Sequence, residues 1–174
     1  MIPRPASSEY PAAFGRYIDL VPDGELARFL EDQTRRLSKF LDALDEAQAG
    51  FRYAPEKWSI KELLGHINDS DRIFGYRILC IARGEKAPLP GYDDNAYVAA
   101  GAFDGRSLAD LLAEFGAIRR ATISLVQSLT PQASTEMGTS NGRALSAGAL
   151  AYMLAGHAEH HLGVLKERYL QKEG

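Results

Sequence analysis

The longest connection between the predicted helices has the sequence GEKAPLPGYDDNAYVAAGAFDGR, residues 84–106. Its prolines and glycines are typical of a segment outside regular structure. A connection of this length inside a compact domain is uncommon and usually has a functional role. It is long enough to cross a helical bundle from one end to the other, so the helices on either side of it can run parallel. Tyr92 and Tyr97 within it could cover a site, although aromatic side chains in loops more often anchor the loop.

Four segments around this connection have the apolar periodicity of helices. Ser59-Ile60-Lys61-Glu62 forms a capping box at the start of the second segment. Asp23, Ser107 and Ser146 are plausible caps of the others. The four segments run from about Gly24 to Glu46, from Ser59 to Ala82, from Ser107 to Leu129 and from Ser146 to Leu170. The sequence therefore predicts an all-α four-helix bundle with a long crossover between the second and third helices.

The rest of the chain shows no internal boundary or repeat. We expect one domain over residues 1–174, with an arm over about residues 1–20 lying against the bundle. Ser140-Asn141-Gly142 is a tight-turn sequence that could form a small hairpin before the fourth helix.

Composition excludes several classes of protein. Apolar residues make up 45% of the chain and charged residues 25%, which is usual for a globular protein. A net charge of -3 gives no basic surface for nucleic acid. No apolar run is long enough to cross a membrane, and the first residues lack the apolar region of a secretory signal. Cys80, the single cysteine, cannot form an intrachain disulfide, and a cytoplasmic location is the simplest expectation.

Three of the four histidines lie in the segment His157-Ala158-Glu159-His160-His161. On a helix, His157 and His161 are about 40° apart on one face, at the centre of the apolar stripe. His160 falls at the edge of that stripe. Buried imidazoles need partners for their nitrogens, and a pair spaced i, i+4 can bind one divalent ion. The alternative is that each histidine forms hydrogen bonds with a carbonyl group or water.

His66 lies on the second predicted helix, about 85° from the centre of its apolar stripe. This position is compatible with a metal ligand that reaches across a cleft, and equally with a surface histidine. Spacing alone does not distinguish the two.

Two segments together resemble the DinB-like (DinB/YfiT) family. They are Trp58-Ser59-Ile60-Lys61-Glu62-Leu63-Leu64-Gly65-His66 and Gly156-His157-Ala158-Glu159-His160-His161-Leu162-Gly163, and the likeness extends over roughly residues 20 to 172. The fragment from Ala82 to Tyr92 resembles a subgroup of that family. The resemblance implies a bundle with up-down-down-up helix order. It also implies a metal site formed by His66, His157 and His161, with His160 as a neighbour that does not bind the ion.

Three histidine ligands and an open coordination position are typical of a catalytic metal site. Zinc, nickel, iron and manganese are all compatible with imidazole ligands. The ion could activate water or polarise a substrate oxygen or sulfur. Asp69 and Glu62, one turn from His66 on either side, are the nearest carboxylates that could orient it. Glu159 points away from the pair, unlike the glutamate of HExxH peptidases.

The resemblance implies a metal-dependent hydrolase or a thiol S-transferase that uses a low-molecular-weight thiol. Its substrate would be a small molecule entering beside residues 84–106. Two alternatives remain. One is a non-catalytic metal-binding or stress-associated bundle, and the other is a helical interaction module whose histidines are satisfied by hydrogen bonds. A homodimer is plausible, because bundles often pair through an outer face.

Overall fold

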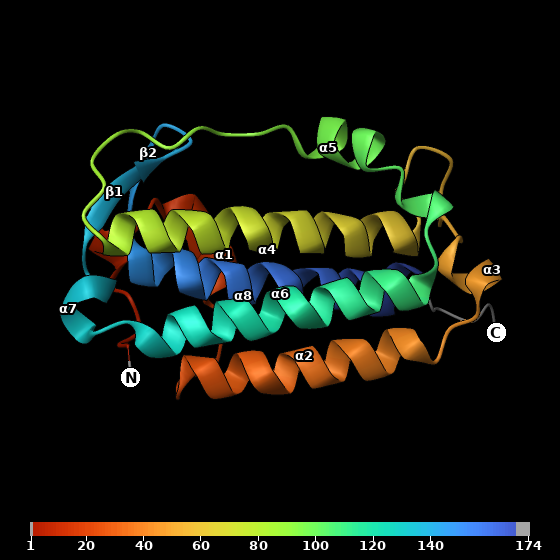
Figure 1. The fold of residues 1–174 in the computed structure, drawn as a ribbon, viewed down its shortest axis with the longest axis horizontal. Helices are drawn as coiled ribbons and strands as arrows, with labels where there is room; N and C mark the ends of the chain where they lie inside the picture. The colour runs from red at the N-terminus through yellow and green to blue at the C-terminus, as the bar shows by residue number, and fades with distance from the viewer. Residues whose placement is uncertain (1, 170–174) are drawn as a thin grey trace.

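The computed structural model describes residues 2–169 and contains four long helices (Figure 1). These are α2 (Leu26–Asp42), α4 (Ile60–Ala82), α6 (Leu108–Ser128) and α8 (Ala147–Val164). The capping box predicted for α4 is present: Oγ of Ser59 accepts a 3.0 Å hydrogen bond from the amide of Glu62, and the Glu62 carboxylate accepts one from the amide of Ser59. Ser107 and Ser146 cap α6 and α8 as predicted.

The predicted limits of two helices need correction. The N-cap of α2 is Glu25 rather than Asp23, because Gly24 has a φ of +138° that no helix accommodates. This helix ends at Asp42, and the short helix α3 (Glu46–Ala49) follows under its own cap. The α-helical part of α8 ends at Val164, and a π-helical turn continues over Leu165–Tyr169. The predicted end of the fourth helix at Leu170 lies outside the described residues.

Helices α2 and α8 run in one direction, and α4 and α6 run in the other (Figure 1). The predicted up-down-down-up order is therefore confirmed. The crossover leaves the end of α4, passes back along the bundle and contains the short helix α5 (Asp94–Gly101) and a 3₁₀ turn (Phe103–Gly105) before α6. Within residues 2–169, no helix combines the length and apolar character that crossing a membrane would require.

A small hairpin joins the crossover to the bundle. After the short helix α7 (Pro131–Ser134), strands β1 (Met137–Ser140) and β2 (Arg143–Ser146) pair antiparallel. Asn141 and Gly142 in the turn have φ values of 50° and 70°, as a two-residue hairpin turn requires. Leu89 of the crossover donates its amide to the carbonyl of Thr139 and accepts from the amide of Asn141. The hairpin predicted from Ser140-Asn141-Gly142 thus fixes one end of the crossover.

The N-terminal segment lies against α8. It contains 3₁₀ turns over Ser7–Glu9 and Ala12–Phe14 and the short helix α1 (Gly15–Ile18). Arg4 donates hydrogen bonds to the carbonyl oxygens of Ile18 and Val21, which closes the segment on itself.

A layer of polar side chains divides the apolar core into two clusters. One cluster includes Leu145 of β2, and the other includes Ala49 of α3. Between the clusters, each long helix contributes a buried polar residue. We call these four residues the polar layer: Gln33, Asp71, Arg119 and His157.

One chain of polar contacts joins all four long helices. Nε of Arg119 in α6 lies 2.6 Å from Oδ2 of Asp71 in α4, and its Nη1 donates a 2.9 Å hydrogen bond to Gln33 in α2. Nε2 of Gln33 donates to the backbone oxygen of Ala155 and to the carboxylate of Glu159, both in α8. These two residues flank the histidine of the polar layer, so the contacts fix α8 beside it.

Removing one partner of the ion pair should destabilise the fold strongly. In Arg119→Met the fully buried carboxylate of Asp71 loses its counter-charge, and we expect the free energy of unfolding to fall by about 3–5 kcal/mol. The double variant Asp71→Leu/Arg119→Met removes both charges and should recover most of that loss. Urea unfolding measures both. Equal losses in the single and double variants would contradict this account.

Close packing of α1 on α8 depends on a glycine. A Cβ atom at Gly156 would lie 1.9 Å from the carbonyl oxygen of Tyr17, whereas one at Gly163 of the same helix would meet nothing within 4 Å. We expect Gly156→Ala to lower the free energy of unfolding by about 1–3 kcal/mol. Gly163→Ala, the matched control, should leave it unchanged or raise it by up to about 1 kcal/mol. Thermal or urea unfolding of the two variants compares them directly.

Candidate metal centre

Three histidines from two antiparallel helices converge between α4 and α8. Nε2 of His157 lies 3.0 Å from Nε2 of His66 and 3.0 Å from Nε2 of His161. One nitrogen from each side chain lies within 4.8 Å of the other two. Two nitrogens that bind one ion at about 2 Å are themselves about 3 Å apart, so the spacing fits a shared ion. The structure therefore brings together all three histidines named from the sequence.

Hydrogen bonds alone do not account for this cluster. Both 3.0 Å contacts end on Nε2 of His157. A neutral imidazole nitrogen carries either one hydrogen or one lone pair, so Nε2 of His157 can complete only one of the two contacts as a hydrogen bond. A cation among the three nitrogens would satisfy all of them, which favours metal binding over the hydrogen-bonded alternative.

The surroundings of the cluster keep the three imidazoles neutral. Burial lowers the pKa of His157 well below its usual value, and the neighbouring His161 and His66 lower it further. Burial also lowers the pKa of His161 to about 3 and lowers the pKa of His66. A neutral imidazole has the lone pair that a metal ion binds, so the cluster is ready to act as a ligand set at neutral pH.

Aromatic rings enclose the cluster on several sides. The ring centroid of Trp58 lies 4.8 Å from that of His66, and the ring centroid of Phe74 lies 5.7 Å from that of His157. Tyr17 of α1 contacts His157 edge-on at 6.0 Å. The sequence assigns no role in the site to Trp58, whereas the structure makes it part of the wall of the site.

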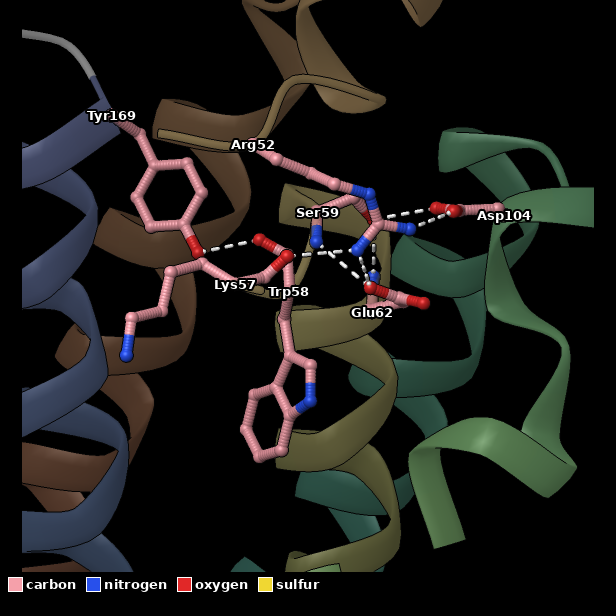
Figure 2. Close-up of polar contacts among 7 residues, drawn as sticks. All are labelled: Arg52, Lys57, Trp58, Ser59, Glu62, Asp104 and Tyr169. Atoms are coloured by element: carbon pink, nitrogen blue, oxygen red, sulfur yellow. Dashed lines mark hydrogen bonds and ion pairs between the residues drawn. The ribbon is translucent and has the colours of Figure 1, made fainter. Parts of the chain in front are cut away.

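The start of α4 is fixed by a group of polar contacts (Figure 2). Arg52 bridges the carboxylates of Glu62 and Asp104, and Ser59 also donates its hydroxyl to Asp104. The hydroxyl of Tyr169 donates a 2.7 Å hydrogen bond to the carbonyl oxygen of Trp58. These contacts connect α4 to the preceding loop, to the crossover and to the turn after α8, and they hold Trp58 beside His66.

The carboxylate nearest to His66 comes from the crossover. Oδ1 of Asp94 lies 4.0 Å from Nδ1 of His66. Neither carboxylate named from the sequence takes this role, because Glu62 binds Arg52 and the capped helix start, and Asp69 lies 3.5 Å from Arg72. Sequence spacing missed Asp94, because it reaches the site through the path of the crossover.

Glu159 and His160 of α8 are not among the three converging histidines, although the ring centroid of His160 lies 5.2 Å from that of His161. The carboxylate of Glu159 binds Gln33 and Arg36, so its predicted direction away from the site is confirmed. His160 is exposed and contacts the ring of Tyr17 at 5.6 Å. Nδ1 of His157 and Nδ1 of His161 have no hydrogen-bond partner among residues 2–169.

Two cavities reach the cluster, one beside His157 and the other beside His161. One, of about 220 Å³, is lined by His157, by side chains of α4 and α8, and by Tyr92 of the crossover. The other, of about 240 Å³, is lined by His161, Trp58 and residues of the neighbouring loop. Tyr92 therefore lies beside the site as the sequence suggested, whereas Tyr97 lines a separate outer hollow that no histidine reaches.

Comparison with known proteins identifies the family. The model of the DinB superfamily matches residues 30–165, which is most of the chain. A search of curated protein sequences gave no significant match. Among solved structures, YfiT from Bacillus subtilis is similar with a TM-score of 0.73 and 16% identity, over 95% of this chain and 91% of YfiT. YfiT is described as a probable metal-dependent hydrolase with an unusual four-helix bundle topology, and at this identity the likeness establishes the fold. On the evidence of the family match, the chain belongs to the DinB superfamily.

Proposed function

We propose that this chain is a metal-dependent enzyme that holds one divalent ion through His66, His157 and His161 and acts on a small molecule. The observation that carries the proposal is the convergence of three imidazole nitrogens next to a cavity. The geometry of His157 supports the proposal further, since its Nε2 cannot form hydrogen bonds with both His66 and His161 at once.

Three protein ligands leave a coordination position for substrate, as in catalytic rather than structural sites. A divalent ion bound there would supply Lewis acidity. Zinc, nickel, iron and manganese remain candidates, because imidazole binds all of them. The cavity beside His157 would admit the substrate, with the ring of Phe74 in its wall, and the ring of Trp58 would cover His66.

The reaction we propose is a hydrolysis or the transfer of a low-molecular-weight thiol. YfiT, which has the same fold, is described as a probable metal-dependent hydrolase. A peptidase of the HExxH type is disfavoured, because the carboxylate of Glu159 is bound by Gln33 and Arg36 instead of facing the histidines. The alternative, a bundle whose ion only supports folding, gives no role to the cavity at His157. The homodimer expected from the sequence remains a prediction that light scattering would check.

The metal site is tested by removing its central ligand. His157→Ala should lose stoichiometric metal, because the remaining two imidazoles hold an ion much more weakly. His160→Ala is the matched control, since this exposed neighbour lies outside the cluster and should keep the metal of the wild type. Elemental analysis of protein purified without an affinity tag measures both. Full metal retention in His157→Ala would rule out the proposed site.

The same samples distinguish an enzyme from a metal-stabilised bundle. Hydrolase and thiol-transfer assays on the wild type and on His160→Ala should give activity that His157→Ala lacks. Added metal should raise the Tm of the wild type but not that of His157→Ala, because only a folded site binds the ion. Metal binding and a raised Tm without turnover in either assay would favour the non-catalytic alternative.

Asp94 should support the metal site through His66. In Asp94→Asn the carboxylate 4.0 Å from Nδ1 of His66 loses its charge, and we expect metal affinity to fall by about tenfold. Asp69→Asn is the control, because Asp69 lies against Arg72 and should leave affinity unchanged. Competition with a chelating dye measures the two affinities. A larger loss in Asp69→Asn than in Asp94→Asn would contradict this assignment.

A further inference from the structure

The cavity beside His157 has an apolar wall and a charged end. Phe74 of α4 and Leu150 and Met153 of α8 form part of the apolar wall. Arg77 of α4 and Arg16 of the N-terminal segment are the two basic residues of the lining. Its volume of about 220 Å³ is smaller than the cavities that hold drug-sized ligands, so it suits a small molecule.

Arg77 is a buried cation without a matching anion. Its side chain is 94% buried, since its relative exposure is 6%. Nη2 donates a 2.6 Å hydrogen bond to the carbonyl oxygen of Pro90, and the guanidinium lies 5.6 Å from the ring centroid of Tyr92. Within residues 2–169 no carboxylate lies within ion-pair distance of it. Burial lowers the pKa of Arg77, which reflects the cost of keeping this charge away from water.

The charges around the cavity are positive on balance. Arg77 and Arg16 share the lining with a single carboxylate, that of Asp94, which lies 4.0 Å from His66 and whose charge raises the pKa of Arg77 against the effect of burial. Tyr92 lies between Arg77 and the part of α4 next to His66: its ring lies beside Arg77, and its hydroxyl is 2.8 Å from Oγ of Ser70, one turn after His66. A small molecule could therefore contact Arg77 at one end and approach the histidines at the other.

We propose that Arg77 binds the carboxylate of a small organic substrate whose apolar part lies along Phe74, Leu150 and Met153. The planar guanidinium matches a carboxylate with two parallel hydrogen bonds, and an anion would supply the missing counter-charge. This inference rests on the proposed function, because it takes the histidine cluster as the place where the other end of the substrate reacts.

Two other roles for Arg77 have to be separated from this one. The hydrogen bond to Pro90 could serve only to anchor the crossover. Arg77 and Tyr92 also line an outer hollow of about 270 Å³ together with Tyr76 and Tyr97, and His157 is not part of its lining. The experiment therefore needs a reporter inside the inner cavity.

Met153 provides that reporter. The chain has three methionines, of which Met153 lines the inner cavity and Met137 lies on β1 outside it. We would label the methionine methyl groups with ¹³C, assign Met153 through Met153→Leu, and titrate the purified protein with 3-phenylpropanoate. The neutral 3-phenylpropanamide, which has the same shape, is the matched ligand. The Met153 signal should shift while that of Met137 stays in place, and the carboxylate should bind at least about tenfold more tightly than the amide.

Variants of Arg77, compared with a variant of Arg83 just after α4, test whether Arg77 binds the carboxylate. Arg77→Gln should weaken binding of 3-phenylpropanoate by about tenfold to a hundredfold, to the level of the amide. Arg77→Lys keeps the charge without the planar fork and should be intermediate. Arg83→Gln, at the exposed end of α4, should bind like the wild type. If Arg77→Gln does not fold, the comparison of carboxylate and amide in the wild type still decides.

Three results would overturn the inference. They are equal binding of carboxylate and amide, carboxylate binding that leaves the Met153 signal unmoved, and tighter binding of inorganic phosphate than of 3-phenylpropanoate. Measuring the metal content of the same samples shows whether the carboxylate site or the metal site has failed. Wild-type protein that prefers the carboxylate but holds no metal would overturn the metal site and leave the carboxylate site standing. Bound metal without a preference for the carboxylate would overturn this inference alone.

Discussion

The alignment of the four long helices along the bundle axis depends on the polar layer formed by Gln33, Asp71, Arg119 and His157. A buried ion pair adds little net stability, because the loss of hydration offsets most of the attraction. It does, however, penalise every alignment in which a buried donor or acceptor is left unpaired. A slip of α8 by one turn, about 5.4 Å, would separate Gln33 from its partners and move His157 away from His66. The fold and the histidine cluster therefore depend on the same alignment.

Features set by local chemistry could be read from the sequence. Ser59, Ser107 and Ser146 cap their helices because a serine hydroxyl needs only the amide three residues later. The common face of His157 and His161 follows from helix geometry alone. The position of His66 did not follow, because α4 packs against both α6 and α8 and buries a wider arc than its apolar stripe. The angular position of a residue around one helix does not show on which sides the neighbouring helices pack.

The surroundings of the histidines were predicted least well, since they come from contacts distant in sequence. Glu62 and Asp69 are one turn from His66, but each has a closer partner of opposite charge. Asp94 reaches the same imidazole from the crossover, whose path is set by Leu89 on the hairpin and by the packing of Phe103 over Gly65. Residue spacing reports neither contact. The length of residues 84–106 did indicate helix direction, because only a long connection can return to the starting end of the bundle.

The four helices and the crossover contribute different residues of the site, and this division has a consequence for evolution and engineering. The histidines and the polar layer belong to the four helices, whereas Asp94 and Tyr92 beside the cavity belong to the crossover. Selection can therefore alter which molecules the cavity admits by changing one contiguous segment, without disturbing the helices that hold the histidines. The segment between the anchors Leu89 and Phe103 is a natural unit for transplantation between relatives, and its exchange offers a direct route to new specificities on an unchanged scaffold.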